Sequence, residues 1–166
     1  GGSQGSLSLN QIMEKIVDSL SILNIQIIWQ TGKDLYQNYV HHQTKTIKVL
    51  PFIEDMANAY AISDLVMSRS GAISCSELTI CGKPSILIPF SNAAADHQTK
   101  NANTLVNNGA AYMFKEKNID FRKFVTAIHN LILDDKQLKS MSKASLKLGN
   151  PKATSDIVNE AMSLIK

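Results

Sequence analysis

The chain has 166 residues, of which 44% are hydrophobic and 19% charged, the composition of one globular domain large enough to bury a core. Its net charge is only +3 and it has no long block of lysine or arginine, which excludes a strong nucleic-acid-binding surface. The most basic stretch, residues 136–147, spaces its lysines around a predicted helix and is interpreted as a solvated face, with at most a weak peripheral attraction to anionic lipid.

The chain begins with a glycine-rich segment, GGSQGS at residues 1–6. Alone, it is typical either of a flexible linker or of a phosphate-binding turn. The apolar residues that follow have the spacing of one helix face: Leu9, Ile12, Met13, Ile16, Val17, Leu20 and Leu23. A turn that leads into a helix directs unpaired N–H groups and the positive end of the helix dipole at one point, which favours anion binding. We therefore predict a phosphate site here.

Strands and helices are predicted to alternate after this helix. Short apolar runs ended by turn signals predict strands at residues 25–32, 46–52, 64–71, 84–90 and 111–114 (or from 110). Helices are predicted between them at residues 55–62, 73–81 and 97–107. Because the runs are continuously apolar, we expect helices on both faces of the sheet. The pattern predicts an α/β fold with a doubly wound parallel sheet.

The remaining residues predict a helical C-terminal tail. One helix follows a cap at Asn118 or Asp120, and a second ends at Gly149. Asn150 is expected to cap a last helix over residues 151–166, with Pro151 at its first position.

A glycine-rich turn of this kind normally follows a strand that is central to the doubly wound sheet. The chain begins at the turn itself, so we expect residues 1–166 to belong to a longer polypeptide. The preceding strand is expected to pack between the strands predicted at residues 25–32 and 64–71. Without it, unpaired backbone groups would line an apolar slot.

The densest cluster of candidate ligand-binding residues follows the third predicted strand. Gly71 allows close approach of a ligand, and the N–H groups of Ala72, Ile73 and Ser74 point out of a helix start. Glu77 lies one turn further and suits a ribose whose two hydroxyls both donate to the carboxylate. The alternatives are a helix cap for the serine and a capping-box partner or solvated charge for the glutamate; the joint occurrence favours the ligand site.

Two further segments are candidates for contacting the same ligand. Phe52, beside free backbone groups at Ile53, could hold a nucleobase, although the segment by itself favours Phe52 and Met56 as core residues. His97 and Gln98 begin a helix after the fourth strand and are expected to face the crevice at the strand ends, where the amide suits sugar hydroxyls. A lone histidine at a helix start is more often structural.

The sequence carries no complete catalytic set. It has no Gly-x-Ser-x-Gly elbow, no lysine-bearing P-loop and no Asp-x-Asp. Cys75 and Cys81 have no histidine at zinc-ligand spacing and indicate a reducing, cytosolic compartment, so we predict no metal site. No signal peptide or apolar run of transmembrane length is evident, so membrane contact is expected to be peripheral at most. These features predict a binder of a phosphorylated ligand.

Three motifs in order, GGSQGS…LN, PFIEDMANAYAISDLVMSRSGAISCSEL and GKPSILIPFSNAAADHQTKNA, resemble the C-terminal half of the MurG family of bacterial N-acetylglucosaminyltransferases. The resemblance covers essentially the whole chain. It implies a Rossmann-like C-terminal domain of a GT-B glycosyltransferase, with residues 1–166 holding the donor UDP-N-acetylglucosamine. It also implies peptidoglycan synthesis at the cytoplasmic face of the inner membrane, by inverting transfer to a lipid-linked muramyl-pentapeptide.

The resemblance also implies roles for individual residues. By matching position, Ser3 would contact the donor diphosphate, and the backbone at Ile53 would read the uracil edge. Glu77 would bind the ribose hydroxyls, and Gln98, with His97 beside it, would meet the sugar hydroxyls. The phosphate-binding segment would comprise Gly71, Ala72, Ile73, Ser74, Cys75 and Ser76.

Catalysis would need more than this half. The general base and the lipid-acceptor surface are expected on an N-terminal domain, so residues 1–166 alone would bind the donor without transferring sugar. No cofactor is implied beyond the donor substrate. The alternatives are a stand-alone donor-binding subunit of a split glycosyltransferase, a non-catalytic UDP-sugar-binding domain, and half of an epimerase-like enzyme, whose catalytic carboxylates are not evident.

Overall fold

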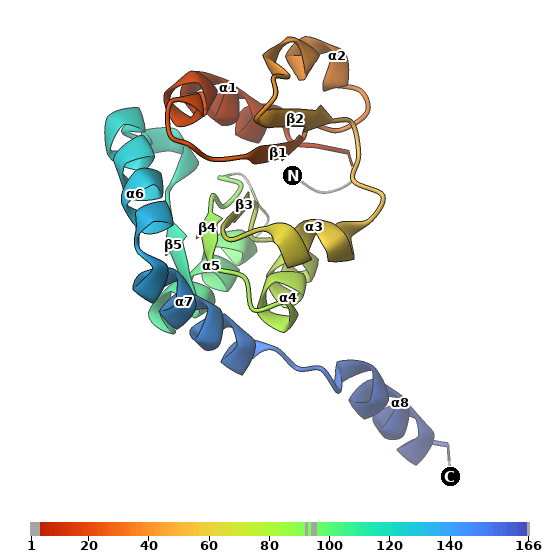
Figure 1. Cartoon of the computed structure of the whole chain (residues 1–166). Coiled ribbons are helices and arrows are strands. Elements are labelled where there is room, and N and C mark those ends of the chain that lie inside the picture. The colour runs from red at the N-terminus through yellow and green to blue at the C-terminus, as the bar shows by residue number, and fades with distance from the viewer. Residues whose placement is uncertain (1–3, 92, 94–95, 166) are drawn as a thin grey trace.

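The computed structural model of the chain describes residues 4–91, 93 and 96–165. Its strands are β1 (Ile27–Gln30), β2 (Ile47–Leu50), β3 (Val66–Ser68), β4 (Ser85–Leu87) and β5 (Ala111–Met113). Its helices are α1 (Leu7–Ser21), α2 (Tyr36–Tyr39), α3 (Met56–Ile62), α4 (Ala72–Ile80), α5 (His97–Asn107), α6 (Phe121–Leu133), α7 (Asp135–Leu148) and α8 (Ala153–Ser163), with 3-10 turns η1 (Val40–His42) and η3 (Glu116–Asn118). Helices surround the strands, and α8 extends away from the body (Figure 1).

Every strand pairing in the described residues is parallel, as expected, and the strands form two sheets, separated where we expected a further strand between residues 25–32 and 64–71. β1 pairs with β2, and β3, β4 and β5 form a second sheet in that order. In a doubly wound order, one strand lies between β1 and β3. No strand of the described residues takes that place, and this is why the sheet is divided.

Burial of the strands also departs from the expectation in part. All three residues of β4 are buried, as expected for a strand covered on both faces. In the other sheet, Ile28 and its partner Lys48 both point to a face that stays exposed. The connection between β1 and β2 holds only the short α2 and η1, which sequence reasoning did not predict.

Helix α1 is anchored to β1 by both polar and apolar contacts. The Ser6 hydroxyl caps its start by accepting a hydrogen bond from the Leu9 N–H. The buried Asn10 accepts a hydrogen bond from the Trp29 indole at 3.0 Å and donates one to the Thr31 carbonyl at 2.8 Å. The apolar face of α1 predicted from sequence packs into the core with β1, β2, α6 and α7, which fixes the direction in which its start points.

A second cluster of core residues lies beneath α3, α4 and α5. It contains Leu78 and Cys75 from α4, Leu87 from β4 and Ala102 from α5, all buried. This packing sets the position of the start of α4 next to the end of β3. The two segments predicted to bind phosphate, at the starts of α1 and α4, are therefore each supported by a core cluster.

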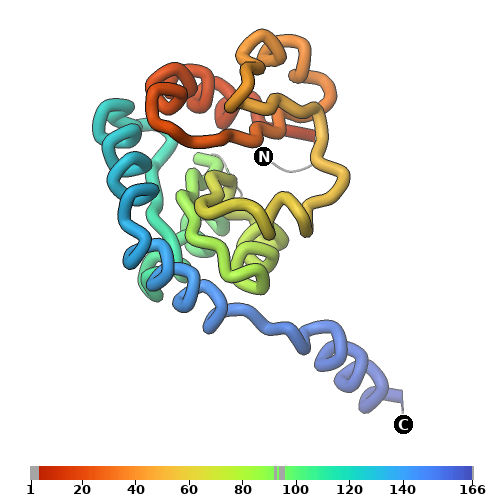
Figure 2. The backbone as a smooth tube through the Cα atoms, viewed as in Figure 1, coloured from red at the N-terminus to blue at the C-terminus, as the bar shows by residue number. Residues whose placement is uncertain are grey.

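The tail is helical, as predicted. Asp120 caps α6 and Asp134 caps α7 through their side chains. The last helix begins at Ala153, two residues later than expected, because Asn150 accepts a hydrogen bond from the Lys152 N–H and closes a turn ahead of the helix. Figure 2 shows how this connection carries α8 away from α7.

None of the side chains of α8 is buried, and its exposed large apolar residues are Ile157, Val158 and Met162. Among the described residues, the helices are all too short or too polar to cross a membrane.

Candidate functional site

Residues 4–6, the described part of the glycine-rich segment, pack against the residues that follow β1. Gly5 and Gly32 both have positive φ, 80° and 92°, in the left-handed region that favours glycine. A Cβ at Gly5 would collide with the backbone of Thr31, and a Cβ at Gly32 with the backbone of Gln4. The turn thus lies directly against the residues that follow β1, and the phosphate-turn interpretation fits this packing better than a linker. Ser3 lies outside the described residues.

A cavity of about 470 Å³ opens beside this turn. Its lining residues are Gly5, Ser6, Leu7, Ser8, Gln11, Arg69, Phe90 and Gln98. Of the residues predicted from sequence to bind ligand, Gln98 lines this cavity. The cavity lies between the start of α1 and the residues after β3 and β4, the edge at which open α/β sheets bind ligands.

Arg69 holds this region together, and sequence reasoning gave it no role. Its side chain is 9% exposed, and its guanidinium donates to the Ser6 hydroxyl and to the carbonyls of Ile88 and Pro89, at 3.1, 2.9 and 3.2 Å. It also forms an ion pair with Glu116 at 2.7 Å. One side chain therefore connects the start of α1, the end of β4 and η3. A buried cation has to be paired, but neither the burial of Arg69 nor its partners can be read from the sequence.

Glu116 is the counter-charge of Arg69. Burial by itself raises the pKa of its carboxyl, but hydrogen bonds from Arg69 and Ser8 and the Arg69 charge outweigh burial and lower that pKa to about 2. The carboxylate is therefore ionised at neutral pH. Because the pair is neutral overall and its donors are used, we assign Arg69 a positioning role and not that of a free phosphate ligand.

The start of α4 is an open helix N-terminus. Its N-cap, Gly71, supplies no side-chain cap, in contrast to Ser6, Asp120 and Asp134 at other helices. The first bond within the helix runs from Cys75 N–H to Gly71 O, so the three preceding N–H groups, those of Ala72, Ile73 and Ser74, have no partner within the helix. A Cβ at Gly71 would meet nothing within 4 Å. Within the described residues, open space and N–H donors without a partner coincide here, as an anion site requires.

Two residues of the predicted phosphate segment are placed less favourably. The Cys75 thiol is buried in the second core cluster, which raises its pKa to about 11, and its N–H is used within the helix. Neither of its polar groups faces a ligand. Ser76 is exposed, but it lies beyond the first turn, where N–H groups are bonded within the helix. Within the segment implied by the resemblance, residues 71–74 therefore offer the more accessible polar groups.

Glu77 is exposed one turn along α4 and is oriented by a tyrosine that sequence reasoning missed. The Tyr60 hydroxyl donates to Glu77 Oε2 at 2.9 Å. Burial, followed by this hydrogen bond and the Glu77 charge, raises the pKa of Tyr60, so the hydroxyl stays protonated as a donor. One carboxylate oxygen is held in place while Oε1 remains for another donor.

The predicted base-binding position is partly occupied. The Ile53 N–H donates to Gln30 Oε1 at 2.9 Å, so a nucleobase edge would meet the Ile53 carbonyl or displace the Gln30 amide. Phe52 is half-buried outside both core clusters, with Lys33 Nζ 6.0 Å from its ring, whereas Met56 packs against the second cluster. The core alternative thus holds for the methionine alone.

Gln98 is held at the start of α5 by two neighbours, one of which is itself held by Asn101. Its Oε1 accepts a hydrogen bond from the Phe90 N–H at 3.0 Å, and its carbonyl accepts one from the Ser70 hydroxyl at 2.8 Å. Asn101 donates to the Ser70 carbonyl at 3.0 Å. The Gln98 amide nitrogen is thereby aimed as a donor, while the neighbouring His97 is exposed. The preceding Asp96 has φ 53°, an uncommon conformation for a residue other than glycine.

Comparisons with known proteins identify the family of the chain. The glycosyltransferase family 28 C-terminal domain matches residues 1–159. A UDP-N-acetylglucosamine–N-acetylmuramyl-(pentapeptide) pyrophosphoryl-undecaprenol N-acetylglucosamine transferase from Flavobacterium psychrophilum is 43% identical over 100% of this chain and 45% of its own length. The protein of the same name from Cytophaga hutchinsonii is 42% identical over 99% of this chain and 44% of its own. The chain spans about half the length of these curated relatives.

A solved structure shows the same fold. The crystal structure of Acinetobacter baumannii MurG matches 98% of this chain and 48% of its own, with a TM-score of 0.86 and 29% identity. A glycosyltransferase of kitacinnamycin matches with a TM-score of 0.70 at 17% identity, which supports the fold alone. The predicted fold class, the α/β C-terminal domain of a GT-B glycosyltransferase with a helical tail, is confirmed. The chain belongs to the glycosyltransferase family 28 C-terminal domain family.

Proposed function

We propose that this chain is the donor-binding half of an inverting glycosyltransferase that moves N-acetylglucosamine from UDP-N-acetylglucosamine to a lipid-linked muramyl-pentapeptide. The observation that carries the proposal is the uncapped start of α4, where three N–H groups border open space and Glu77 follows one turn later. The printed names of the relatives supply the donor and acceptor classes.

Each part of the donor has a chemically matched group. The α4 N–H groups and the Ser74 hydroxyl suit the diphosphate, together with the turn at residues 1–6, in which we propose Ser3 as a contact. The free oxygen of Glu77 suits the ribose hydroxyls, and the Ile53 backbone suits the uracil edge. The Gln98 amide nitrogen suits the sugar hydroxyls, with His97 beside it.

The contribution of these groups to the reaction is electrostatic. When the acceptor hydroxyl displaces UDP at the anomeric carbon, negative charge grows on the departing diphosphate. Fixed N–H dipoles at a helix start stabilise that charge without reorganising. The base that takes the proton from the acceptor hydroxyl is proposed to lie outside residues 1–166, with the lipid-acceptor surface, at the cytoplasmic face of the membrane.

Calorimetric titration of the chain with UDP and UDP-N-acetylglucosamine tests this proposal. We expect both to bind, and uridine to bind at least about tenfold more weakly because it has no diphosphate for the helix start. Incubation with UDP-N-acetylglucosamine and a lipid-linked acceptor should give no transfer by these residues alone. Equal binding of UDP and uridine would contradict the diphosphate site. Sugar transfer by these residues alone would contradict the proposal that the general base lies outside residues 1–166.

A further inference from the structure

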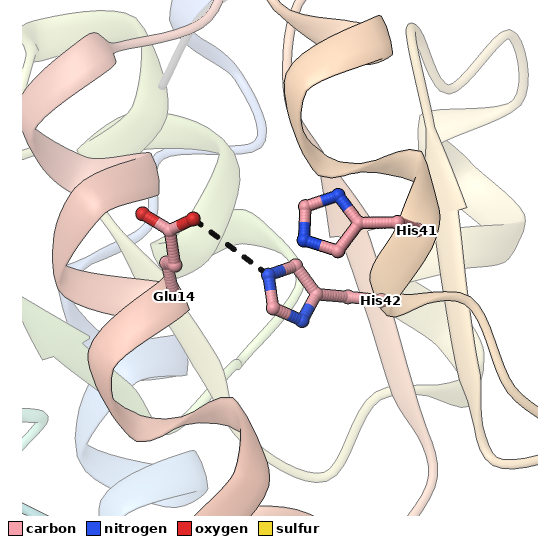
Figure 3. A group of neighbouring side chains, drawn as sticks. All are labelled: Glu14, His41 and His42. Atoms are coloured by element: carbon pink, nitrogen blue, oxygen red, sulfur yellow. Dashed lines mark ion pairs between the residues drawn. The ribbon is translucent and has the colours of Figure 1, made fainter.

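A second group of chemically reactive side chains lies away from the proposed donor site. Glu14 projects from the middle of α1, and His41 and His42 project from η1 toward it (Figure 3). One ligand atom from each of the three lies within 4.8 Å of those of the other two. We propose that these side chains form a binding site for a divalent transition-metal ion of the zinc class.

His42 is the fixed member of the group. Its side chain is 16% exposed and packs on Trp29, with 5.7 Å between the ring centroids. Its Nε2 is buried, with no hydrogen-bond partner among the described residues. The nearest carboxylate oxygen, Glu14 Oε1, is 3.8 Å away, which is an ion-pair contact too long for a hydrogen bond. A buried nitrogen without a partner is costly, and a metal ion between it and the carboxylate would satisfy both.

The other two side chains can adjust. Glu14 and His41 are exposed, and the His41 ring stacks on that of His42 with centroids 4.1 Å apart. Ligand atoms around a tetrahedral zinc ion lie about 3.3 Å from one another, given bonds of about 2.0–2.1 Å. The present separations exceed this, so binding requires the exposed side chains to rotate toward the fixed His42. Solvent-exposed rotamers interconvert readily, and the backbone of α1 and η1 does not have to move.

The chemistry of the group selects the metal. Two neutral imidazoles and one carboxylate are a ligand set that zinc sites use, with a water in the fourth position. Imidazole ligands favour zinc, copper and nickel over magnesium and calcium, which prefer oxygen. Spacing along the sequence could not reveal the site, because the glutamate and the histidines come from different elements. For this reason the sequence predicted no metal.

The location separates this site from donor binding. Glu14 lies seven residues into α1, roughly 10 Å from the helix start that faces the donor cavity. η1 precedes β2, whereas the proposed donor-binding residues follow their strands. A bound ion would tie α1 to the segment between β1 and β2. The proposal therefore assigns the ion a structural role in this chain and does not depend on the proposed function.

Zinc titration by calorimetry tests the site. The whole chain is used in a Cys81→Ser background, because that cysteine is exposed and offers a competing thiolate. We expect one zinc ion to bind per chain. Glu14→Gln and His41→Ala should each weaken zinc binding at least about tenfold. The matched controls, Glu160→Gln on α8 and His129→Ala on α6, should leave it unchanged.

A cobalt titration and a nucleotide titration complete the test. Co²⁺ should give the visible absorption bands of tetrahedral coordination without thiolate charge transfer, and these should vanish in the Glu14→Gln, His41→Ala double variant. UDP binding and melting temperature without metal should be the same in that variant, since both side chains are exposed. Failure to bind zinc, or equal zinc binding by the double variant and the parent, overturns the proposal and leaves an ordinary His42–Glu14 ion pair.

Discussion

Gly71 leaves space open for a ligand, whereas Gly5 allows the turn to pack against the Thr31 backbone. Alanine substitutions test these two roles separately. Gly71 has φ −63°, which any residue adopts, and a Cβ there would enter open space. Gly71→Ala should therefore melt like the parent chain, while its methyl group takes space that the diphosphate needs. We expect UDP binding to weaken by about 1 kcal/mol or more, roughly fivefold, by calorimetry.

Gly5→Ala is the comparison variant. Its backbone has φ 80°, and the added Cβ would collide with the Thr31 carbonyl. We expect a melting temperature lower by several degrees, because strain of this kind costs about 1–3 kcal/mol. If both alanine variants melted alike, the close approach of the turn to the end of β1 would be contradicted.

Glu77 provides a test of ribose recognition. Glu77→Ala should weaken UDP binding at least about tenfold, because hydrogen bonds to a charged group contribute about 1.5–3 kcal/mol each. The same variant should bind 2′,3′-dideoxy-UDP almost as well as the parent, since that ligand has no ribose hydroxyls to lose. Glu160→Ala, on the exposed α8, is the matched control. An equal loss for both nucleotides would mean that Glu77 acts through the fold.

The Arg69–Glu116 pair predicts acid sensitivity. The pKa of Glu116 is about 2 in the folded chain against 4.5 for the free group, so the carboxylate stabilises the fold above about pH 4.5 and loses this effect as the pH falls toward 2. Glu116→Gln should be less stable by roughly 3 kcal/mol at pH 7, and the difference should shrink below pH 4.5. Thermal melts between pH 7 and 3 measure this. A constant difference across that range would show that the ion pair is not the source.

At the scale of the elements, the sequence predicted each core helix and strand, but it missed the short connecting helices and overestimated the lengths of the strands. The apolar spacing of α1 and the run that became β4 leave few alternatives, because burial dictates both patterns. α2 and η1 were missed because they are short and polar and have no periodic face. The predicted strands were too long, since their last residues turn out of the sheet and supply the site.

In the candidate site too, sequence reasoning found residues whose chemistry lies in one segment and missed residues whose contacts join distant elements. The Gly71 turn and Glu77 were found because their chemistry lies within one short segment. Arg69 was quoted in a motif but not assigned, because its partners come from α1, β4 and η3. Tyr60 was missed for the same reason: its contact with Glu77 joins two helices. Contacts between distant elements carry no spacing that a single sequence reveals.

Helix α8 is expected to contribute little to the stability of the rest of the molecule. None of its residues is buried, and Figure 2 shows it apart from the other helices. Removal of residues 152–166 should therefore change the melting temperature by no more than about 2 °C and leave UDP binding unaltered. Calorimetric melts of the two versions decide this. A large drop would mean that the apolar residues of α8 are covered in solution.

At the scale of the whole molecule, the divided sheet predicts a gain from one more strand. β1 and β3 face a position that no strand of the described residues occupies. Extending the chain ahead of Gly1 by an apolar strand-forming segment should raise the melting temperature by several degrees, because a paired strand buries apolar area and satisfies backbone groups. UDP binding should tighten, because the turn at residues 1–6 gains support. An equally long extension interrupted by prolines, which cannot pair, is the control. Equal melting of all three versions would contradict this.

The divided sheet also predicts the order in which parts of the molecule unfold locally. Backbone amides of β1 and β2 depend on each other, while those of β3, β4 and β5 form a separate ladder. Arg69 and the core around α1 are the contacts that join the two halves. Such a chain is expected to fluctuate in two cooperative units. In hydrogen–deuterium exchange the β4 amides, paired on both sides, would exchange last, after those of the other four strands, which have one partner strand each.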